Sequence, residues 1–367
     1  MFSRNSLKRV SRLALLTVLL CASFFGGRAQ SNNVPLTSQE LVRLVYQLPK
    51  QPEKRDEVVD EIRRRGIGFP LTDGMRSLVA TKSGNDATLR RTLEEAERRR
   101  VNPTASALPS TVEAEQLLNN ARAATLAASE AMPDFIVRQL ITRSEARGKY
   151  INWRVLDHLS IAVSYRASRG EEYKLLSVNG QPPVTDAREG GSYEEVGGTS
   201  STGEYVSMLA ALFKETTQAT FRVVDTDTLR SHRTVVYEFN VRKENSNLSI
   251  KAGRDRSVIT GYRGRVWLDR ESFRVLRVEM ISTEIPADFP VTAASSMIDY
   301  DWVVINERRY LLPVAAEIKL TAGSGEQARH SRNEIRFRGY QKFGAEVKII
   351  EDVEPDEEPQ TKPQTNP

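Results

Sequence analysis

From residue 134 to residue 343 the sequence repeats short segments in which apolar and polar residues alternate, and this repetition limits the possible folds more than any other feature. A period of two is typical of β-strands with one covered face and one solvated face. In the segment 296–304 the apolar face consists of Ile298, Tyr300, Trp302 and Val304. The opposite face is mixed and consists of Met297, Asp299, Asp301 and Val303.

About ten such segments follow one another, and turn signals such as Asn179-Gly180 separate them. One of them, 258–268, is expected to form a single strand. The pattern predicts an α+β fold, in which a small N-terminal all-helical domain precedes a large curved antiparallel β half-barrel. Two covering helices are expected at 112–131 and 205–215, and at 1.5 Å per residue they would be roughly 30 and 16 Å long.

Helices this short leave two interpretations of the apolar face of the sheet. Either the barrel is filled by its own side chains, or part of its concave face holds an apolar ligand. The candidate cavity residues for the second case are Trp267, Ile298, Tyr300, Trp302, Ile335 and Phe337. In the first case the same side chains form an ordinary core.

Residues 36–100 show helical rather than alternating periodicity. In the first segment of this region the apolar residues at helical spacing are Leu41, Leu44, Val45 and Leu48. We therefore expect a helical module, which the small, polar, proline-containing linker 101–111 joins to the half-barrel domain at 112–350. The last residues, 351–367, are acidic and proline-rich and are expected to be disordered.

The first 29 residues predict export from the cytoplasm. A basic start precedes an apolar stretch at 13–25, which has the length of a secretory signal and is short for a membrane span. The small residues Gly27 and Ala29 place the expected cleavage after Ala29. A lipoprotein signal at Cys21 is the alternative, which the bulky residues at 18–20 disfavour. The mature chain is expected to be cysteine-free, periplasmic or otherwise exported, and without a transmembrane segment.

The excess of positive charge belongs to this leader. The chain has 53 basic and 48 acidic residues, and five of the basic residues but none of the acidic ones lie before residue 30. The remaining chain is electrically balanced. A nucleic-acid partner is therefore not expected.

The residue types that catalysis and metal binding need do not form a recognisable pattern. The histidines are His158, His232 and His330. They fall in separate segments without the spacing of metal ligands. Asp299 and Asp301 share one strand face, where an acid pair or a cation site is conceivable, but charges on a solvated face are the simpler interpretation. Ser160 lies near His158 without the glycine elbow of a hydrolase. We expect no enzyme, no catalytic residue, no metal and no cofactor.

The segment 262–277, YRGRVWLDRESFRVLR, resembles the signature hairpin of the outer-membrane lipoprotein-sorting superfamily, the LolA/LolB-like carriers. A helix before the first strands and a second helix within the strand region also fit that family. The likeness covers about residues 112–350. It implies a half-open antiparallel barrel with helices as a lid and an apolar cavity that holds acyl chains.

Together these features predict an exported, non-enzymatic binding protein. Its half-barrel is expected to hold a hydrophobic ligand, a lipid or a lipoprotein acyl chain, or an envelope protein partner in its concave face. The alternative is a structural or scaffolding protein of the cell envelope whose barrel is filled by its own side chains and takes no ligand.

Overall fold

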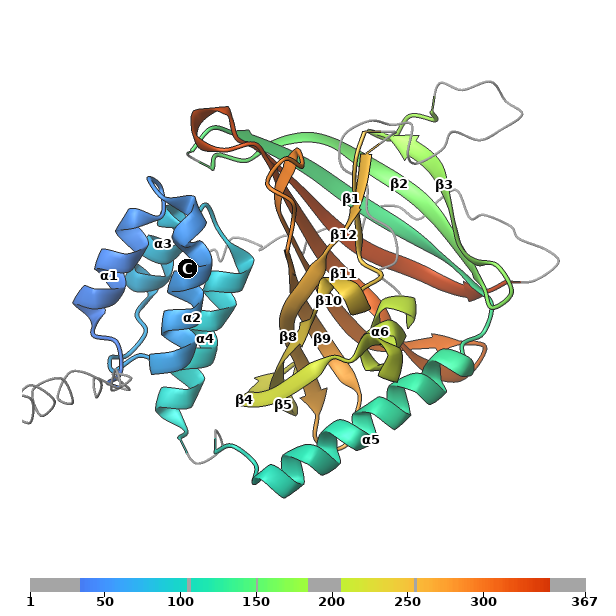
Figure 1. Cartoon of the computed structure of the whole chain (residues 1–367), viewed down its shortest axis with the longest axis horizontal. Helices are drawn as coiled ribbons and strands as arrows, with labels where there is room; N and C mark the ends of the chain where they lie inside the picture. The colour runs from blue at the N-terminus through green and yellow to red at the C-terminus, as the bar shows by residue number, and fades with distance from the viewer. Residues whose placement is uncertain (1–33, 104–106, 150, 184–205, 254–255, 344–367) are drawn as a thin grey trace, which may run out of the picture. The chain divides into compact units, whose positions relative to one another are not determined.

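The structure is a computed structural model that describes residues 34–103, 107–149, 151–183, 206–253 and 256–343 (Figure 1). The expected signal peptide and the acidic tail lie outside these residues. The chain divides into two compact units. The first ends at Val101 and the second begins at Asn102, except that residues 48–52 group with the second unit.

The regular elements of the first unit are helices, apart from a single parallel bridge between Leu36 and Ile67. Its elements are α1 (Ser38–Gln47), the 3-10 turn η1 (Pro52–Lys54), α2 (Arg55–Arg65), α3 (Asp73–Lys82) and α4 (Ala87–Val101). At the start of α1, the Glu40 amide donates to the Thr37 hydroxyl at 3.2 Å, and the Thr37 amide donates to the Glu40 carboxylate at 2.8 Å. This reciprocal cap fixes where the first helix begins. Hydrogen bonds from the Thr37 backbone and from Arg65 lower the pKa of Glu40 to about 2.

The second unit contains a ten-stranded antiparallel sheet. Its strands are β1 (Phe135–Arg147), β2 (Arg154–Arg166), β3 (Gly170–Val178), β4 (Thr220–Leu229), β5 (His232–Val241), β8 (Gly261–Asp269), β9 (Val275–Thr283), β10 (Val291–Ile305), β11 (Arg308–Ala322) and β12 (Arg329–Lys342). The order across the sheet is β3-β2-β1-β12-β11-β10-β9-β8-β5-β4. In Figure 1 the sheet curves and its two edge strands stay apart, which confirms the predicted α+β half-barrel.

The prediction of a single strand at 258–268 is wrong. The segment belongs to two strands, β7 (Arg256–Ile259) and β8, and β7 pairs with β6 (Ser249–Ala252) in a separate two-stranded sheet. The chain changes partner at Thr260, whose amide donates to the Leu248 carbonyl at 2.9 Å. Alternation continues through such a break, so the sequence pattern does not reveal it.

Three two-residue loops place both central residues in the left-handed backbone region. They are Asn179-Gly180 (φ 51° and 78°), Arg230-Ser231 (φ 48° and 68°) and Asn306-Glu307 (φ 47° and 65°). This conformation defines the type I′ turn, whose twist matches that of an antiparallel hairpin. The Asn-Gly turn was predicted from its residues. The other two loops lack glycine and show that the flanking strands impose the conformation.

Two helices lie on one face of the sheet, which we call the covered face. They are α5 (Thr111–Glu130) and α6 (Val206–Phe213), and they contact each other (Figure 1). The helix residues that join the buried cluster of this face are Ala114, Leu117, Ala121, Leu209, Leu212 and Phe213. Within the described residues, none of the helices combines the length and the hydropathy that a bilayer crossing needs.

The opposite face, which we call the outer face, carries a smaller buried cluster on β4, β5, β8 and β9. Its members are Leu229, Val236, Trp267 and Leu276. Arg230, at the β4–β5 turn, donates to the carbonyl of Leu276 at 3.3 Å and lies 3.3 Å from the carboxylate of Asp301. The turn therefore reaches over the outer face of β9 and β10.

Candidate ligand-binding face

The covered face is largely apolar across the width of the sheet, although the buried Gln139 of β1 lies among its apolar residues. Every strand of the ten-stranded sheet contributes side chains that belong to, or pack against, one buried cluster. A chain of aromatic rings runs through it beside α6, with ring centroids 5.5 Å apart for Phe213 and Phe221, 6.2 Å for Phe221 and Phe239, and 6.0 Å for Phe239 and Tyr262. This continuous apolar surface is the part of the domain best suited to an apolar ligand.

Four of the six candidate cavity residues lie together on this face. Ile298 and Tyr300 in β10, and Ile335 and Phe337 in β12, all belong to the covered-face cluster. Their side chains are at most 2 % exposed. The structure thus brings them together as the candidate site requires, and it also shows them already packed.

The two tryptophans of the candidate set are placed elsewhere. Trp267 lies on the outer face, because its neighbours Val266 and Leu268 point to the covered face and side chains alternate along a strand. Its indole nitrogen donates to the Asp227 carboxylate at 3.1 Å. Trp302 is half-buried, and its ring lies between the guanidinium groups of Arg274 and Arg309, at 5.7 and 5.2 Å.

The alternation expected for 296–304 does not persist to the end of β10. Beyond Tyr300, Val303 packs against the covered-face cluster and Ile305 belongs to it, whereas Val304 is 60 % exposed. The register between β10 and β11 shifts between Asp299 and Tyr300. This irregularity accounts for the different setting of Trp302, since the side chains after it no longer follow the phase of Ile298.

Toward one end of β1 the covered face becomes polar. Arg143 is buried, and its guanidinium group donates to both carboxylate oxygens of Asp157 in β2, at 2.7 and 2.6 Å. Across the other edge of β1, Arg143 lies opposite Asn333 of β12, which is 1 % exposed. The pair Ile141 and Leu159, one step along the same two strands, belongs to the apolar cluster.

These polar residues were not predicted as part of the site, although the sequence contains a signal for them. Arg143 follows Val137 and Ile141 in the same alternating phase, and Asn333 precedes Ile335 and Phe337 in the same way. A charged residue at an inward phase of a strand is costly to bury unless it is paired. Searching each strand for such exceptions, rather than for apolar residues alone, would have revealed Arg143.

Polar bonds connect α5 to the sheet. The Tyr237 hydroxyl of β5 donates to the Ala114 carbonyl at 2.7 Å. From the β8–β9 turn region, Arg270 pairs with Glu113 and Arg274 donates to the Ala124 carbonyl. Burial raises the pKa of Tyr237 to about 12, so its hydroxyl remains a donor at neutral pH. The helix rests on small side chains and is positioned by these few bonds.

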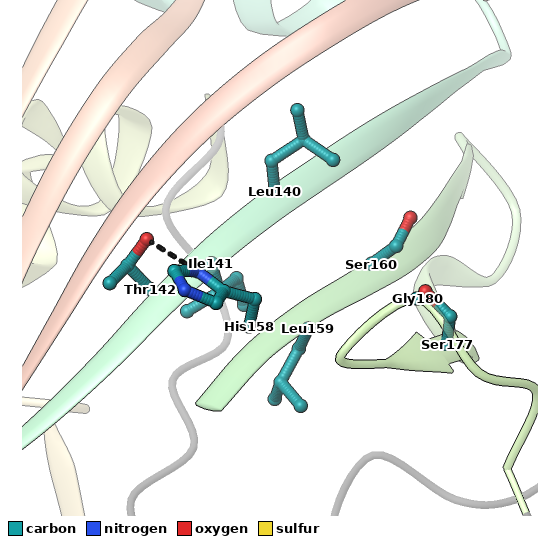
Figure 2. Close-up of a pocket in the computed structure, with 8 residues that line it drawn as sticks. All are labelled: Leu140, Ile141, Thr142, His158, Leu159, Ser160, Ser177 and Gly180. Carbon is teal, nitrogen blue, oxygen red and sulfur yellow. Dashed lines mark hydrogen bonds between the residues drawn. The ribbon is translucent and has the colours of Figure 1, made fainter. Parts of the chain in front are cut away.

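An open depression of about 310 Å³ lies on the outer face of β1 to β3 (Figure 2). The side chains of Leu140, Thr142, His158, Ser160 and Ser177 line it. The Thr142 hydroxyl and the Nδ1 atom of His158 are 3.2 Å apart. The depression faces away from the covered-face cluster and has a mixed lining of apolar and hydroxyl-bearing residues.

The residues considered for chemistry occupy separate structural roles. Asp299 is held by a two-point ion pair with Arg277, at 2.7 and 3.2 Å, and Asp301 pairs with Arg230. His330 lies 3.0 Å from the Thr321 hydroxyl and is paired with Ala146 of β1, whereas His158 is paired with Thr142 of the same strand. No group of three or more potential metal ligands occurs among the residues that the structure describes.

Comparisons with known proteins add little to this description. No protein-family model matches the chain, and no curated protein matches it. It is similar to the solved structure of a LolA superfamily protein from Nitrosomonas europaea, with 13% identity, 63% of this chain and 94% of that chain covered, and a TM-score of 0.27. It is also similar to a DUF1329 family protein from Desulfovibrio piger, with 9% identity, coverage of 65% and 96%, and a TM-score of 0.28.

At these TM-scores neither likeness carries an argument about what the chain binds. The first structure comes from the superfamily that the 262–277 hairpin resembles. The sheet order and the position of the two helices define the class of domain, an open antiparallel half-barrel with a helical cover.

Proposed function

We propose that this chain is an exported, non-enzymatic binding protein that holds a hydrophobic ligand, such as a lipid or an acyl chain, on the covered face of its half-barrel. One observation carries the proposal: the covered face changes along its strands from large apolar side chains to the buried pair of Arg143 and Asp157. An amphiphilic ligand shows the same change from apolar to polar along its length. Its hydrocarbon chain would match the apolar part of the face, and its head group would match the polar end.

The buried ion pair supports a binding role because it is a poor way to stabilise a fold. Removing two charges from water costs several kcal/mol, and apolar residues of similar size often stabilise a core equally well. Arg143 and Asp157 have side-chain exposures of only 7% and 16%. Guanidinium and carboxylate groups at the end of an apolar surface provide donors and acceptors for the head of a ligand.

The helical cover supports the same proposal. The side chains that α5 buries are small or of medium size, namely Ala114, Leu117, Ala121 and Thr125. Helix α5 contacts β8. A helix that is held by little apolar area and a few polar bonds can separate from the sheet at low cost, which would admit an apolar chain to side chains such as Ile335 and Phe337.

The test is to purify the full chain without detergent, analyse it by native mass spectrometry, and extract and identify any bound lipid. A delipidated sample is then titrated with a fluorescent fatty acid. Ala316→Phe, which adds a ring on the covered face, is expected to reduce uptake. Ala315→Phe, at the neighbouring residue on the other face, is the matched control. Absence of both bound lipid and uptake in the unmodified chain would reject the proposal.

The alternative is a structural protein of the cell envelope with a self-filled barrel. The packing of the covered face favours it, because Tyr300, Ile335 and Phe337 are at most 2 % exposed. In that case Ala316→Phe lowers the free energy of unfolding and the unmodified chain takes up no fatty acid at any concentration.

A further inference from the structure

The hairpin of β10 and β11 is joined to its neighbours over only part of its length. The ladder between β9 and β10 ends at the pair of Arg277 and Asp299. The ladder between β11 and β12 ends at the pair of Ala315 and Arg336. Beyond these pairs, the ladders of the described strands join residues 300–313 of the hairpin only to each other. We call residues 300–313 the hairpin end.

The base of the hairpin end is irregular. Asp299 pairs with Ala315 and the next residue, Tyr300, pairs with Pro313, so Val314 is an extra residue in β11. Such a bulge bends its strand locally. Pro313 beside it has no amide proton and cannot donate to a ladder, and prolines in sheets occur at edges and bulges for this reason. The bulge and the proline give the hairpin end a hinge at the level where its neighbours stop pairing.

The facing strand, β12, also bends at this level. Two of its residues, Gly339 and Tyr340, stand against Val137 of β1. Gly339 has a φ of 67°, which glycine adopts without a steric penalty. A bulge of this kind increases the twist of its strand. The two bulges account for the end of the ladder between β11 and β12. We call the boundary between residues 308–314 and residues 337–342 the seam.

Side chains close the seam where the ladder is interrupted. Leu312, Phe337 and Tyr340 belong to the covered-face cluster. The Tyr340 hydroxyl donates to the carbonyl of Pro313 at 2.7 Å. Burial raises the pKa of Tyr340, so its hydroxyl remains protonated and keeps this bond at neutral pH. Movement of the hairpin end away from β12 would break this bond and expose apolar side chains of the covered face.

The opposite side of the hairpin end is held by a charged group. Arg230, at the β4–β5 turn, donates to the carbonyls of Leu276 and Tyr300. Its guanidinium group also lies 3.5 and 3.3 Å from the carboxylates of Asp299 and Asp301. Hydrogen bonds of ionised groups are roughly twice as strong as neutral ones. The hairpin end is therefore tethered toward β9 more firmly than toward β12, where the hydroxyl-to-carbonyl bond is neutral.

We propose that the hairpin end swings away from β12 and that an apolar ligand enters the covered face through the seam. This inference rests on the proposed function, because it concerns how the ligand of that site arrives. Separation of α5 provides room for the ligand, and the seam provides the way in. Phe337 lines the seam and is itself one of the candidate ligand-site residues, so a chain that passes the seam reaches the candidate site directly.

The first test measures opening without a ligand. Leu312→Cys is placed in the full chain together with Cys21→Ser, which removes the single cysteine of the sequence. The matched reporter is Ile298→Cys, which is similarly buried but lies where β10 is paired on both sides. A thiol-reactive dye should label Leu312→Cys at least about tenfold faster, because local opening exposes it. Tyr340→Phe should raise that rate about fivefold and leave Ile298→Cys unchanged.

Equal labelling of the two reporters, or no response of Leu312→Cys to Tyr340→Phe, would overturn the opening. If a reporter variant does not fold, as judged by circular dichroism, hydrogen exchange of the unmodified chain gives the same comparison. Amides of residues 308–314 should then exchange faster than those of residues 316–320, and equal exchange counts against the seam.

The second test measures the rate at which a fluorescent fatty acid associates with the full chain in stopped flow. Tyr340→Phe should speed association about fivefold. The control is Thr292→Val, which removes a hydroxyl bond to the Gly323 carbonyl at the other end of the same strand pair and should leave the rate unchanged. An unchanged rate in Tyr340→Phe, or equal acceleration in both variants, overturns the seam as the entrance. Absence of uptake by the unmodified chain rejects the proposed function instead, and the labelling test shows separately whether the seam opens.

Discussion

The hydroxyl group of Tyr237 in β5 donates a hydrogen bond of 2.7 Å to the backbone carbonyl of Ala114 in α5. This bond connects the sheet to its helical cover through an otherwise apolar layer. Tyr237→Phe removes it and is expected to lower the free energy of unfolding by about 1 kcal/mol. It should also speed hydrogen exchange at the amides of residues 111–121, measured by mass spectrometry.

Tyr340→Phe is the control for this variant. The Tyr340 hydroxyl donates to the Pro313 carbonyl at 2.7 Å, between two strands rather than to the helix. It should cost a similar stability and leave exchange in α5 unchanged. Equal exchange in α5 for both variants would show that the Tyr237 bond does not hold the cover.

Stability is expected to fall at high pH. Burial raises the pKa of both Tyr237 and Tyr262 from 10.0 to about 12. Between the two pKa values the tyrosine hydroxyl loses its proton in the unfolded state but keeps it in the folded state, and this difference favours unfolding as the pH rises. The contribution of these two tyrosines to the free energy of unfolding should therefore be constant below pH 10 and decrease from there to about pH 12. Urea unfolding at a series of pH values measures this, and Tyr262→Phe should make the decrease smaller.

Gly264 is expected to be irreplaceable in the 262–277 hairpin. A Cβ atom at this position would lie 1.9 Å from the Glu279 carbonyl oxygen and 2.8 Å from the ring of Phe239. Gly264→Ala should therefore lower the free energy of unfolding by about 3 kcal/mol, as overpacking does. Gly74→Ala in α3, where the nearest atom is 3.9 Å away, should instead stabilise its helix by up to ~1 kcal/mol. Thermal unfolding of both variants measures the contrast.

The buried ion pair gives a prediction in which stability and ligand binding diverge. Arg143→Met alone leaves the Asp157 carboxylate buried without its partner and is expected to cost about 3–5 kcal/mol. Adding Asp157→Leu should restore most of that stability, because no buried charge remains. Denaturant unfolding measures both variants.

Uptake of a fluorescent fatty acid then distinguishes the roles of the pair. The double variant is expected to fold but to bind the fatty acid more weakly than the unmodified chain, since the polar end of the covered face is lost. Unchanged uptake by the folded double variant would contradict a role of Arg143 in holding the head group.

The two tryptophans of the strands should respond differently to truncation. Trp267 is 1 % exposed, so Trp267→Ala is expected to cost about 3–5 kcal/mol. Trp302 is half-buried between two guanidinium groups, and Trp302→Ala should cost about 1 kcal/mol. Chemical denaturation compares them directly. A larger loss for Trp302 would place it in a core that the structure does not show.

The alternation of the strands was enough to predict the half-barrel, because a period of two fixes which face of each strand is apolar. Ile335 and Phe337 could be assigned to one face from the sequence for this reason. The alternation alone could not show which faces of different strands lie on the same side of the sheet. Trp267 appeared equivalent to Ile298, but it packs on the other face, under Leu229 at the β4–β5 turn.

Other features depend on pairings that a single strand does not encode. The register shift beside Tyr300 changes the phase of β10, and the proline that marks it, Pro313, lies opposite Tyr300 in β11 rather than in β10 itself. The pair of Arg143 and Asp157 becomes visible only when β1 and β2 are placed in register. Arg138 and Arg338, which are far apart in sequence, likewise become neighbours only through the pairing of β1 with β12.

The pairing of β1 with β12 joins the beginning of the half-barrel to its end, with Phe135 opposite Lys342. Until residues 329–342 have been synthesised, β1 to β3 have no ladder that connects them to the other strands. A polypeptide still emerging from the ribosome therefore lacks the contacts that complete the sheet, and contacts this distant in sequence form slowly. Such a topology delays the complete sheet until β12 has been synthesised, so β1 to β3 wait for the last strand of the sheet before they join the others.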